Sequence, residues 1–119
     1  MRILLADDHG IVRYDYRAFQ TKQRVFKEDV TYQITHLLEG VCTPVKDGSY
    51  ASTGRRTERL GRPRAGKTGT TNDSKDVWFV GFSPDLAVGV FMGYDRPRSL
   101  GDSATAGRYA APIFGDFMK

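Results

Sequence analysis

Four consecutive residues, Lys67-Thr68-Gly69-Thr70, combine a cation, two hydroxyl groups and a residue without a side chain. On one strand, the lysine would supply positive potential to an anionic substrate and influence proton transfer, and a hydroxyl would bind a carboxylate. The glycine would allow the backbone of an extended ligand to approach the edge of the strand. These residue types, side by side, predict a site for an anionic ligand that lies along the strand.

A nucleotide-binding motif overlaps the same residues. Residues 61–68 match the phosphate-binding pattern G-x-x-x-x-G-K-[ST] at every fixed position. That motif needs a buried strand before it and a helix after it, because backbone amides and the helix N-terminus cradle the phosphates. Residues 55–59 are too polar for a buried strand, and residues 68–73 are poor helix formers. Nucleotide binding is therefore a minor alternative.

The start of the chain, residues 2–13, resembles the first strand of a response-regulator receiver domain. The adjacent carboxylates of Asp7 and Asp8 would suit a hard cation such as magnesium. A receiver would also need an apolar strand that ends in an acceptor aspartate about 45 residues further on, followed by regular β/α alternation. The sequence there is a polar loop at residues 53–56. A receiver-like domain is a second minor alternative, and the two aspartates are interpreted as turn residues.

Positive charge is concentrated in one segment. The chain carries 18 Lys and Arg residues against 14 acidic ones, a net charge of +4, and six of the cations lie close together: Arg55, Arg56, Arg59, Arg62, Arg64 and Lys67. A nucleic-acid surface would interleave aromatic residues with such a run, and none lies between Ser52 and Val77. No nucleic-acid partner is predicted, which leaves a solvated basic loop or attraction of an anionic substrate.

Single residues give no sign of a cofactor or metal. Cys42 is the only cysteine, which excludes an internal disulfide or a cysteine zinc site, and it is predicted to be a small core residue. His36 falls off the apolar stripe of its segment and is predicted to be solvated, and His9 to lie in a turn. No segment has the roughly 18 consecutive apolar residues of a membrane span, and the first eight residues do not resemble a signal peptide.

The elements that must position the four residues follow from periodicity. Val30, Ile34, Leu37, Leu38 and Val41 recur at helical spacing, which predicts a helix over residues 28–42. Residues 43–64 lack either period and predict a long surface loop. Residues 65–71 are followed by two apolar runs, 77–82 and 86–92, which predict an antiparallel hairpin covered on both faces.

The two ends of the chain carry weaker patterns. Residues 2–6 and 11–14 predict a short hairpin. A closing helix is predicted with Pro112 in its first turn and five residues on one face, namely Ala110, Ile113, Phe114, Phe117 and Met118.

The sequence from residue 60 to residue 118 closely resembles the end of the transpeptidase domain of bifunctional class A penicillin-binding proteins. The likeness rests on the K-T-G-T box and on the motifs of residues 61–73, 76–85, 88–95, 104–107 and 110–114. It implies an α/β fold of the α+β type: part of the β-lactamase/DD-peptidase fold, in which antiparallel strands are flanked by helices. Two features depart from the family pattern: residues 43–50 are longer than the family turn, and Ala106 replaces an expected glycine.

The resemblance also implies a division of the chain. Residues 1–119 would form part of one transpeptidase domain, with residues 1–27 weakly assigned, a helix at 28–42 and a loop at 43–64. Residues 65–118 would supply the KTGT strand, the hairpin and the C-terminal helix.

The resemblance implies peptidoglycan cross-linking as the activity of the parent protein. A serine would attack the D-Ala-D-Ala carbonyl of a stem peptide to form an acyl-enzyme, which an amine resolves and which β-lactams trap. Lys67 would tune the electrostatics of the site, Thr68 would be chiefly structural, and Gly69 would lie against the substrate. Thr70 would bind the terminal or β-lactam carboxylate through its hydroxyl, with its amide in the oxyanion hole. Thr68 and Thr70 are expected to alternate in direction along the strand.

The nucleophile of that chemistry is missing from the sequence. None of the six serines is followed three residues later by lysine, and the only asparagine, Asn72, lies beside the KTGT box. The chain alone is therefore expected to be inactive, with stem peptides and β-lactams as ligands once the rest of the domain is present. The parent would work in the periplasm.

The alternative is a non-enzymatic binding module or remnant whose basic loop binds acidic ligands. Without the remaining helices, the hairpin should expose apolar surface that binds dyes or promotes association.

Overall fold

The computed structural model describes residues 2–6, 12–16, 25–45 and 51–119, the first two ranges by their backbone alone. The elements occur in the following order: strands β1 (Arg2–Ala6) and β2 (Val12–Tyr16), helix α1 (Glu28–Cys42), 3-10 helix η1 (Arg55–Leu60), strand β3 (Ala65–Thr70), 3-10 helix η2 (Asn72–Ser74), strands β4 (Asp76–Phe82) and β5 (Ala87–Gly93), and helix α2 (Ala110–Phe117).

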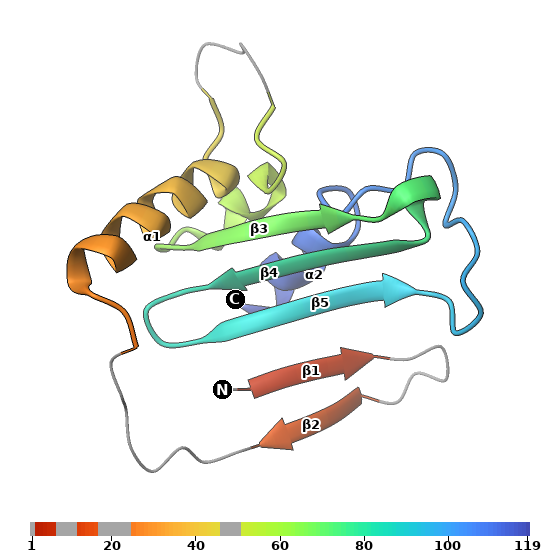
Figure 1. Ribbon diagram of the computed structural model, residues 1–119, viewed down its shortest axis with the longest axis horizontal. Coiled ribbons are helices and arrows are strands. Elements are labelled where there is room, and N and C mark those ends of the chain that lie inside the picture. Colours follow the sequence, from red (N-terminus) through yellow and green to blue (C-terminus); the bar gives the residue numbers. More distant parts are fainter. Residues whose placement is uncertain (1, 7–11, 17–24, 46–50) are drawn as a thin grey trace.

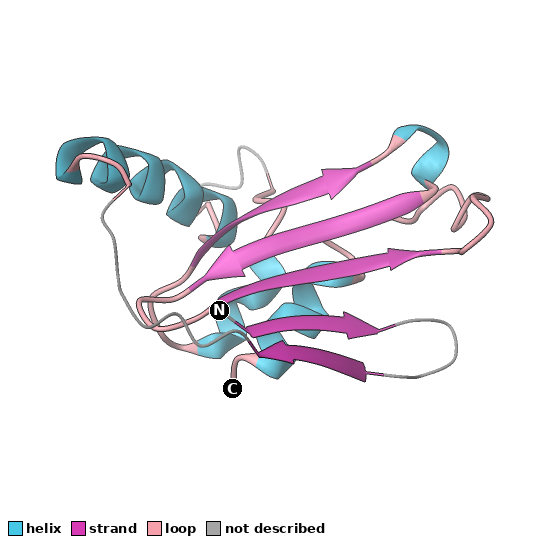
Figure 2. Cartoon of the chain, turned by 60° about the horizontal axis from the view of Figure 1, so that its bottom comes forward, coloured by secondary structure: helices cyan, strands magenta, loops and turns pink. Residues whose placement is uncertain are grey.

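Three of the strands form an antiparallel sheet in the order β3-β4-β5. β1 and β2 form a separate antiparallel hairpin, and β1 lies alongside β5 in both views (Figures 1 and 2). The antiparallel pairing of β1 with β2 excludes the receiver interpretation, which needs parallel strands. Asp7, Asp8 and His9 lie outside the described residues. The α/β class with antiparallel strands and flanking helices is confirmed.

The core lies between the sheet and α2, which runs behind β4 and β5 in Figure 1. Side chains alternate between the two faces of a strand, so Val77 and Phe79 of β4 and Val88 and Val90 of β5 point to the same side and are buried. Phe114 of α2 is also fully buried, and its ring centroid lies 5.0 Å from that of Phe79 in a tilted arrangement. This aromatic pair is the centre of the core.

The other face of the sheet is uncovered in the described chain. Trp78, Val80 and Phe91 point to this open face and are 41%, 51% and 37% exposed. The prediction that the hairpin is covered on both faces was therefore wrong for the described residues. Both faces carry apolar side chains, so the sequence pattern alone could not show that a helix packs against only one of them. Whether this surface binds dyes stays a prediction.

Helix α1 has the predicted bounds but not the predicted burial. Glu28 and Asp29 lie in its first turn, where carboxylates interact favourably with the helix dipole. Val30, Ile34 and Leu37 of its apolar stripe are exposed, whereas Leu38 and Val41 are half-buried, and within the helix only Cys42 is buried. His36 is solvated as predicted, with its side chain 73% exposed. In the described part of the chain, no helix has the length and apolar character needed to cross a membrane.

Helix α2 follows its predicted pattern in part. Pro112 is its third residue and thus lies in the first turn, as expected. Ala110, Phe114 and Met118 are buried, whereas Ile113, expected on the same face, is 45% exposed. A helix of eight residues offers only a narrow stripe to the sheet, so the flank of the predicted face remains in solvent.

The predicted loop of residues 43–64 contains the 3-10 helix η1. The buried Thr57 donates its hydroxyl hydrogen to the Gly54 carbonyl at 2.8 Å and accepts a hydrogen bond from Arg64 Nε at 3.0 Å. Arg64 Nη2 also donates to the Cys42 carbonyl at 3.2 Å. One arginine therefore ties the end of α1 to η1 just before β3 begins. Short 3-10 turns held by such side-chain bonds have no period that sequence patterns reveal.

Cys42 should be protected in the folded state. Burial raises the pKa of its thiol, although a hydrogen bond with Thr57 and the charge of Arg64 act in the opposite direction. We expect iodoacetamide to react at least about tenfold more slowly with the native chain than with the urea-unfolded chain.

The raised pKa of Cys42 also predicts a pH dependence of the free energy of unfolding. Because the thiol of the unfolded chain loses its proton first, this free energy should fall as the pH rises from the unfolded pKa towards the folded one. Urea melts across this alkaline range test this, and a Cys42→Ala variant with an unchanged pH dependence would contradict it.

Candidate functional site

The four residues of the KTGT box form the second half of β3, which lies at the edge of the three-stranded sheet. The amide of Thr71 donates to the carbonyl of Asp76 at 3.0 Å, so these residues form a hydrogen-bonded pair across β3 and β4. In an antiparallel ladder such pairs alternate along the strand. The amides and carbonyls of Thr68 and Thr70 therefore point away from β4, towards the edge of β3 that pairs with no other strand in the described chain.

The side chains of the box divide between the two faces of the sheet. Lys67 lies opposite Val80 and points to the open face, whereas Thr68 lies opposite Phe79, whose side chain points to the core side. Thr70 shares the face of Thr68 because the two are separated by two residues, which is the period of a strand. The expectation that the two threonines alternate in direction was therefore wrong.

Both threonines line a cavity of about 460 Å³, which we call the threonine groove. Its walls come from residues 51–56, from β3 and from residues 105–108. The hydroxyl of Thr68 donates to the hydroxyl of Thr53 at 2.9 Å, and the amide of Ala106 donates to Thr70 Oγ1 at 3.3 Å. Thr53 and the Ala106 amide are site components that sequence reasoning missed.

Ala106 belongs to the hydrophobic core. Its side chain is fully buried, its amide reaches Thr70, and its carbonyl accepts a hydrogen bond from the amide of Ala111 at 2.9 Å. The alanine that replaces an expected glycine is thus part of the packing between the groove and α2.

Lys67 folds back along its own strand. Its ammonium group donates to the Thr68 carbonyl at 2.9 Å and lies 3.5 Å from the Thr68 hydroxyl. The side chain is exposed and crosses from the open face towards the edge of the strand. The lysine charge is thereby held next to the edge groups of Thr68, where an extended ligand would pair with the strand.

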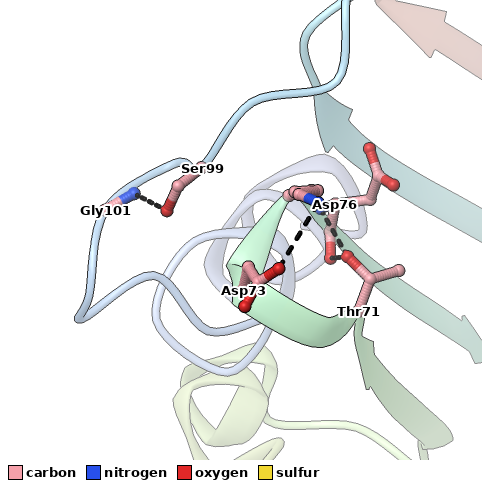
Figure 3. Close-up of polar contacts among 6 residues, drawn as sticks. Thr71, Asp73, Asp76, Ser99 and Gly101 are labelled. Atoms are coloured by element: carbon pink, nitrogen blue, oxygen red, sulfur yellow. Dashed lines mark hydrogen bonds and ion pairs between the residues drawn. The ribbon is translucent and has the colours of Figure 1, made fainter.

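The turn that follows β3 fixes the end of the strand (Figure 3). Thr71 Oγ1 accepts a hydrogen bond from the amide of Asp76 at 2.8 Å, closing the turn. Asp73 and Ser74 adopt left-handed backbone conformations, with φ of 59° and 49°, which are uncommon for residues with a side chain. The amide of Leu100 donates to the Ser74 carbonyl at 2.9 Å and so joins this turn to the segment after β5.

Three arginines line the threonine groove, namely Arg55, Arg56 and Arg108. Arg56 Nη1 lies 3.5 Å from the Arg108 carbonyl, a long hydrogen bond that joins the two walls. Among the described residues that line the groove, none is acidic. The groove thus combines hydroxyl groups with positive charge, which suits a carboxylate.

The phosphate-binding interpretation does not fit this geometry. The lysine of the motif lies inside an edge strand, the segment before it contains a 3-10 helix, and the element directly after the strand is the short 3-10 helix η2 and not an α-helix. The nest of amides at a helix N-terminus that cradles phosphates is therefore missing from this part of the described chain. The described residues also contain no group of three side chains arranged to hold a metal ion.

Residues 10–119 match the family model of the penicillin binding protein transpeptidase domain. The chain belongs to this transpeptidase family. The match covers almost the whole chain, including the β3 strand and both walls of the threonine groove.

The chain is similar to several proteins named penicillin-binding protein 1A. The chain is 47% identical to the one from Rickettsia prowazekii (strain Madrid E) over 95 residues, which is 80% of this chain and 11% of the relative. It is 52% identical over 87 residues to the one from Rickettsia bellii (strain RML369-C), covering 73% of this chain and 10% of the relative. For Neisseria lactamica the identity is 46% over 76 residues, 63% of this chain and 10% of the relative. The chain spans about a tenth of the length of these relatives.

Proposed function

We propose that this chain supplies the KTGT strand of a peptidoglycan D,D-transpeptidase, and that this strand binds the C-terminal end of a stem peptide or a β-lactam. The observation that carries the proposal is the placement of Thr68 and Thr70 on one face of a free strand edge, above a groove lined by arginines. An extended peptide can add to such an edge while its carboxylate enters the groove.

Each residue of the box has a role in this proposal. Thr70 donates its hydroxyl hydrogen to the terminal carboxylate, since its oxygen already accepts the Ala106 amide. Its own amide, which points out of the free edge, stabilises the oxyanion that forms at the attacked carbonyl. Gly69 leaves room for the ligand backbone, because only one atom, Trp78 Cβ, lies within 4 Å of the place that a Cβ atom would occupy here. Lys67 contributes positive potential on the side of the open face.

The nucleophilic serine and its base have no counterpart in this sequence, so in this proposal they come from the remainder of the transpeptidase domain. The open face around Trp78 and Val80 is next to Lys67 and is available for that remainder to cover. The complete enzyme would act on peptidoglycan, on the periplasmic side of the inner membrane.

Replacement of Thr70 by valine tests the carboxylate site. Loss of one hydrogen bond to a charged group should weaken binding of acetyl-Lys-D-Ala-D-Ala about ten- to a hundredfold, followed by NMR titration of the 119-residue chain. Thr35→Val on α1 is the matched control, because it removes a hydroxyl outside the threonine groove. A wild-type chain that does not respond to the peptide, or a Thr70→Val variant that binds it equally well, would contradict the proposal.

A second experiment concerns the nucleophile. Incubation of the purified chain with benzylpenicillin should leave its intact mass unchanged, because no activated serine is present. A covalent adduct of one penicillin molecule per chain would show that the chain carries a nucleophile of its own.

A further inference from the structure

We propose that Arg55, Arg56 and Arg108 form an anion subsite in the threonine groove, which binds a second carboxylate of the peptide whose terminal carboxylate lies at Thr70. This inference rests on the proposed function, because it takes the groove to be the place where the end of the stem peptide binds. It specifies the substrate class as a stem peptide with an acidic group close to its terminal carboxylate.

The three arginines come from two segments that the fold brings together. Arg55 and Arg56 begin η1, and Arg108 lies in the turn before α2. The long hydrogen bond between Arg56 Nη1 and the Arg108 carbonyl, at 3.5 Å, places the two segments against each other at the groove. All three side chains are exposed, so a ligand in the groove can reach them from solvent.

Arg55 and Arg56 also border a second cavity, which Glu58 and Asp116 line, but none of the three arginines forms an ion pair with an acid among the described residues. Ion pairs among the described residues join Lys75 to Asp73 and Lys119 to Asp116, and neither pair reaches the groove. Three positive charges around one cavity repel one another and create a positive potential inside it. An anionic group bound between them would relieve this repulsion.

The hydroxyl groups of the groove are neutral donors and cannot balance the charge of an anionic ligand. The hydroxyl hydrogen of Thr68 is already donated to Thr53, which leaves those of Thr53, Thr70 and Thr105 for a ligand. The cavity of about 460 Å³ falls within the usual size range of sites that hold a whole small ligand rather than one functional group. A second acidic group in this space would find arginine donors, which pair with carboxylates through two parallel hydrogen bonds.

Two peptides that differ only in one charge test the subsite. Acetyl-Glu-D-Ala-D-Ala and acetyl-Gln-D-Ala-D-Ala have nearly the same shape, and both end in the same carboxylate. We expect the Glu peptide to bind the 119-residue chain about tenfold more tightly by NMR titration. The triple variant Arg55→Gln/Arg56→Gln/Arg108→Gln should lose this preference and bind the Gln peptide within about twofold of wild type.

Controls separate the subsite from general charge and from folding. Arg96→Gln changes the net charge in an exposed segment outside the groove and should keep the tenfold preference. The single variant Arg108→Gln should lose part of the preference, and circular dichroism of each variant verifies the fold.

The outcomes distinguish the two levels of the proposal. Equal binding of both peptides to the wild-type chain would overturn the anion subsite and leave the KTGT site intact, provided that Thr70→Val weakens both. An unchanged preference in a folded triple variant would also overturn the subsite. If neither peptide binds, the proposed function itself fails, and the subsite with it.

Discussion

Replacement of Phe114 by alanine should lower the free energy of unfolding by about 3–5 kcal/mol. The side chain is fully buried between α2 and β4, and its removal leaves Phe79 without its aromatic neighbour at 5.0 Å. Domains of ordinary stability have only about 5–15 kcal/mol in total, so this one change should remove a large part of it. Urea denaturation followed by circular dichroism measures the difference.

Phe117→Ala is the matched control for this experiment. Phe117 belongs to the same helix but is 37% exposed, so its truncation removes less buried apolar area and leaves no enclosed cavity. We expect a cost of no more than about 1.5 kcal/mol. Equal losses for the two variants would mean that α2 does not pack against the sheet through Phe114.

Replacement of Gly107 by alanine should disturb the threonine groove more than any other single-methyl change near it. A Cβ atom at this position would overlap the carbonyl oxygen of Thr53, which is backbone and cannot rotate away. The segment that carries Ala106 and Arg108 would have to move away from residues 51–54. Overpacking of this kind costs about 1–3 kcal/mol, and the peptide affinity of the chain should fall with it.

The same substitution at Gly40 provides the comparison. No atom lies within 4 Å of a Cβ atom at this exposed helical position. Alanine is the better helix former there, so Gly40→Ala should stabilise the chain by about 0.5–1 kcal/mol. Thermal unfolding of both variants checks the opposite signs. A Gly107→Ala variant as stable as wild type, with unchanged peptide binding, would contradict the close approach of the two walls.

Periodicity was sufficient to predict most of the elements. The helical repeat from Val30 to Val41 indicated α1, and the apolar runs separated by a three-residue turn indicated β4 and β5. These patterns are local, because each residue's neighbours along the chain determine them. Burial was predicted less well, since the partly exposed stripe of α1 and the open face of the sheet depend on which surfaces meet.

Of the candidate site, only the residues on strand β3 could be predicted from the sequence. The chemical types in Lys67-Thr68-Gly69-Thr70 indicated β3, but the partners of the threonines lie far away in sequence. Thr53 stands in a polar segment with no period, and the amide of Ala106 is a backbone group that no residue type reveals. Such contacts between distant segments depend on the tertiary fold, and the spacing of residues along the chain does not reveal them.

Strand β3 presents different chemistry on its two faces, with the lysine on the open side and the threonines over the groove. Because side chains alternate with a period of two, a single-residue insertion or deletion before Lys67 would exchange the two faces. The lysine would enter the arginine-lined groove, and the hydroxyls would face the bare apolar surface. We therefore expect evolution in this strand to proceed by replacing side chains, with its length between the flanking turns held constant.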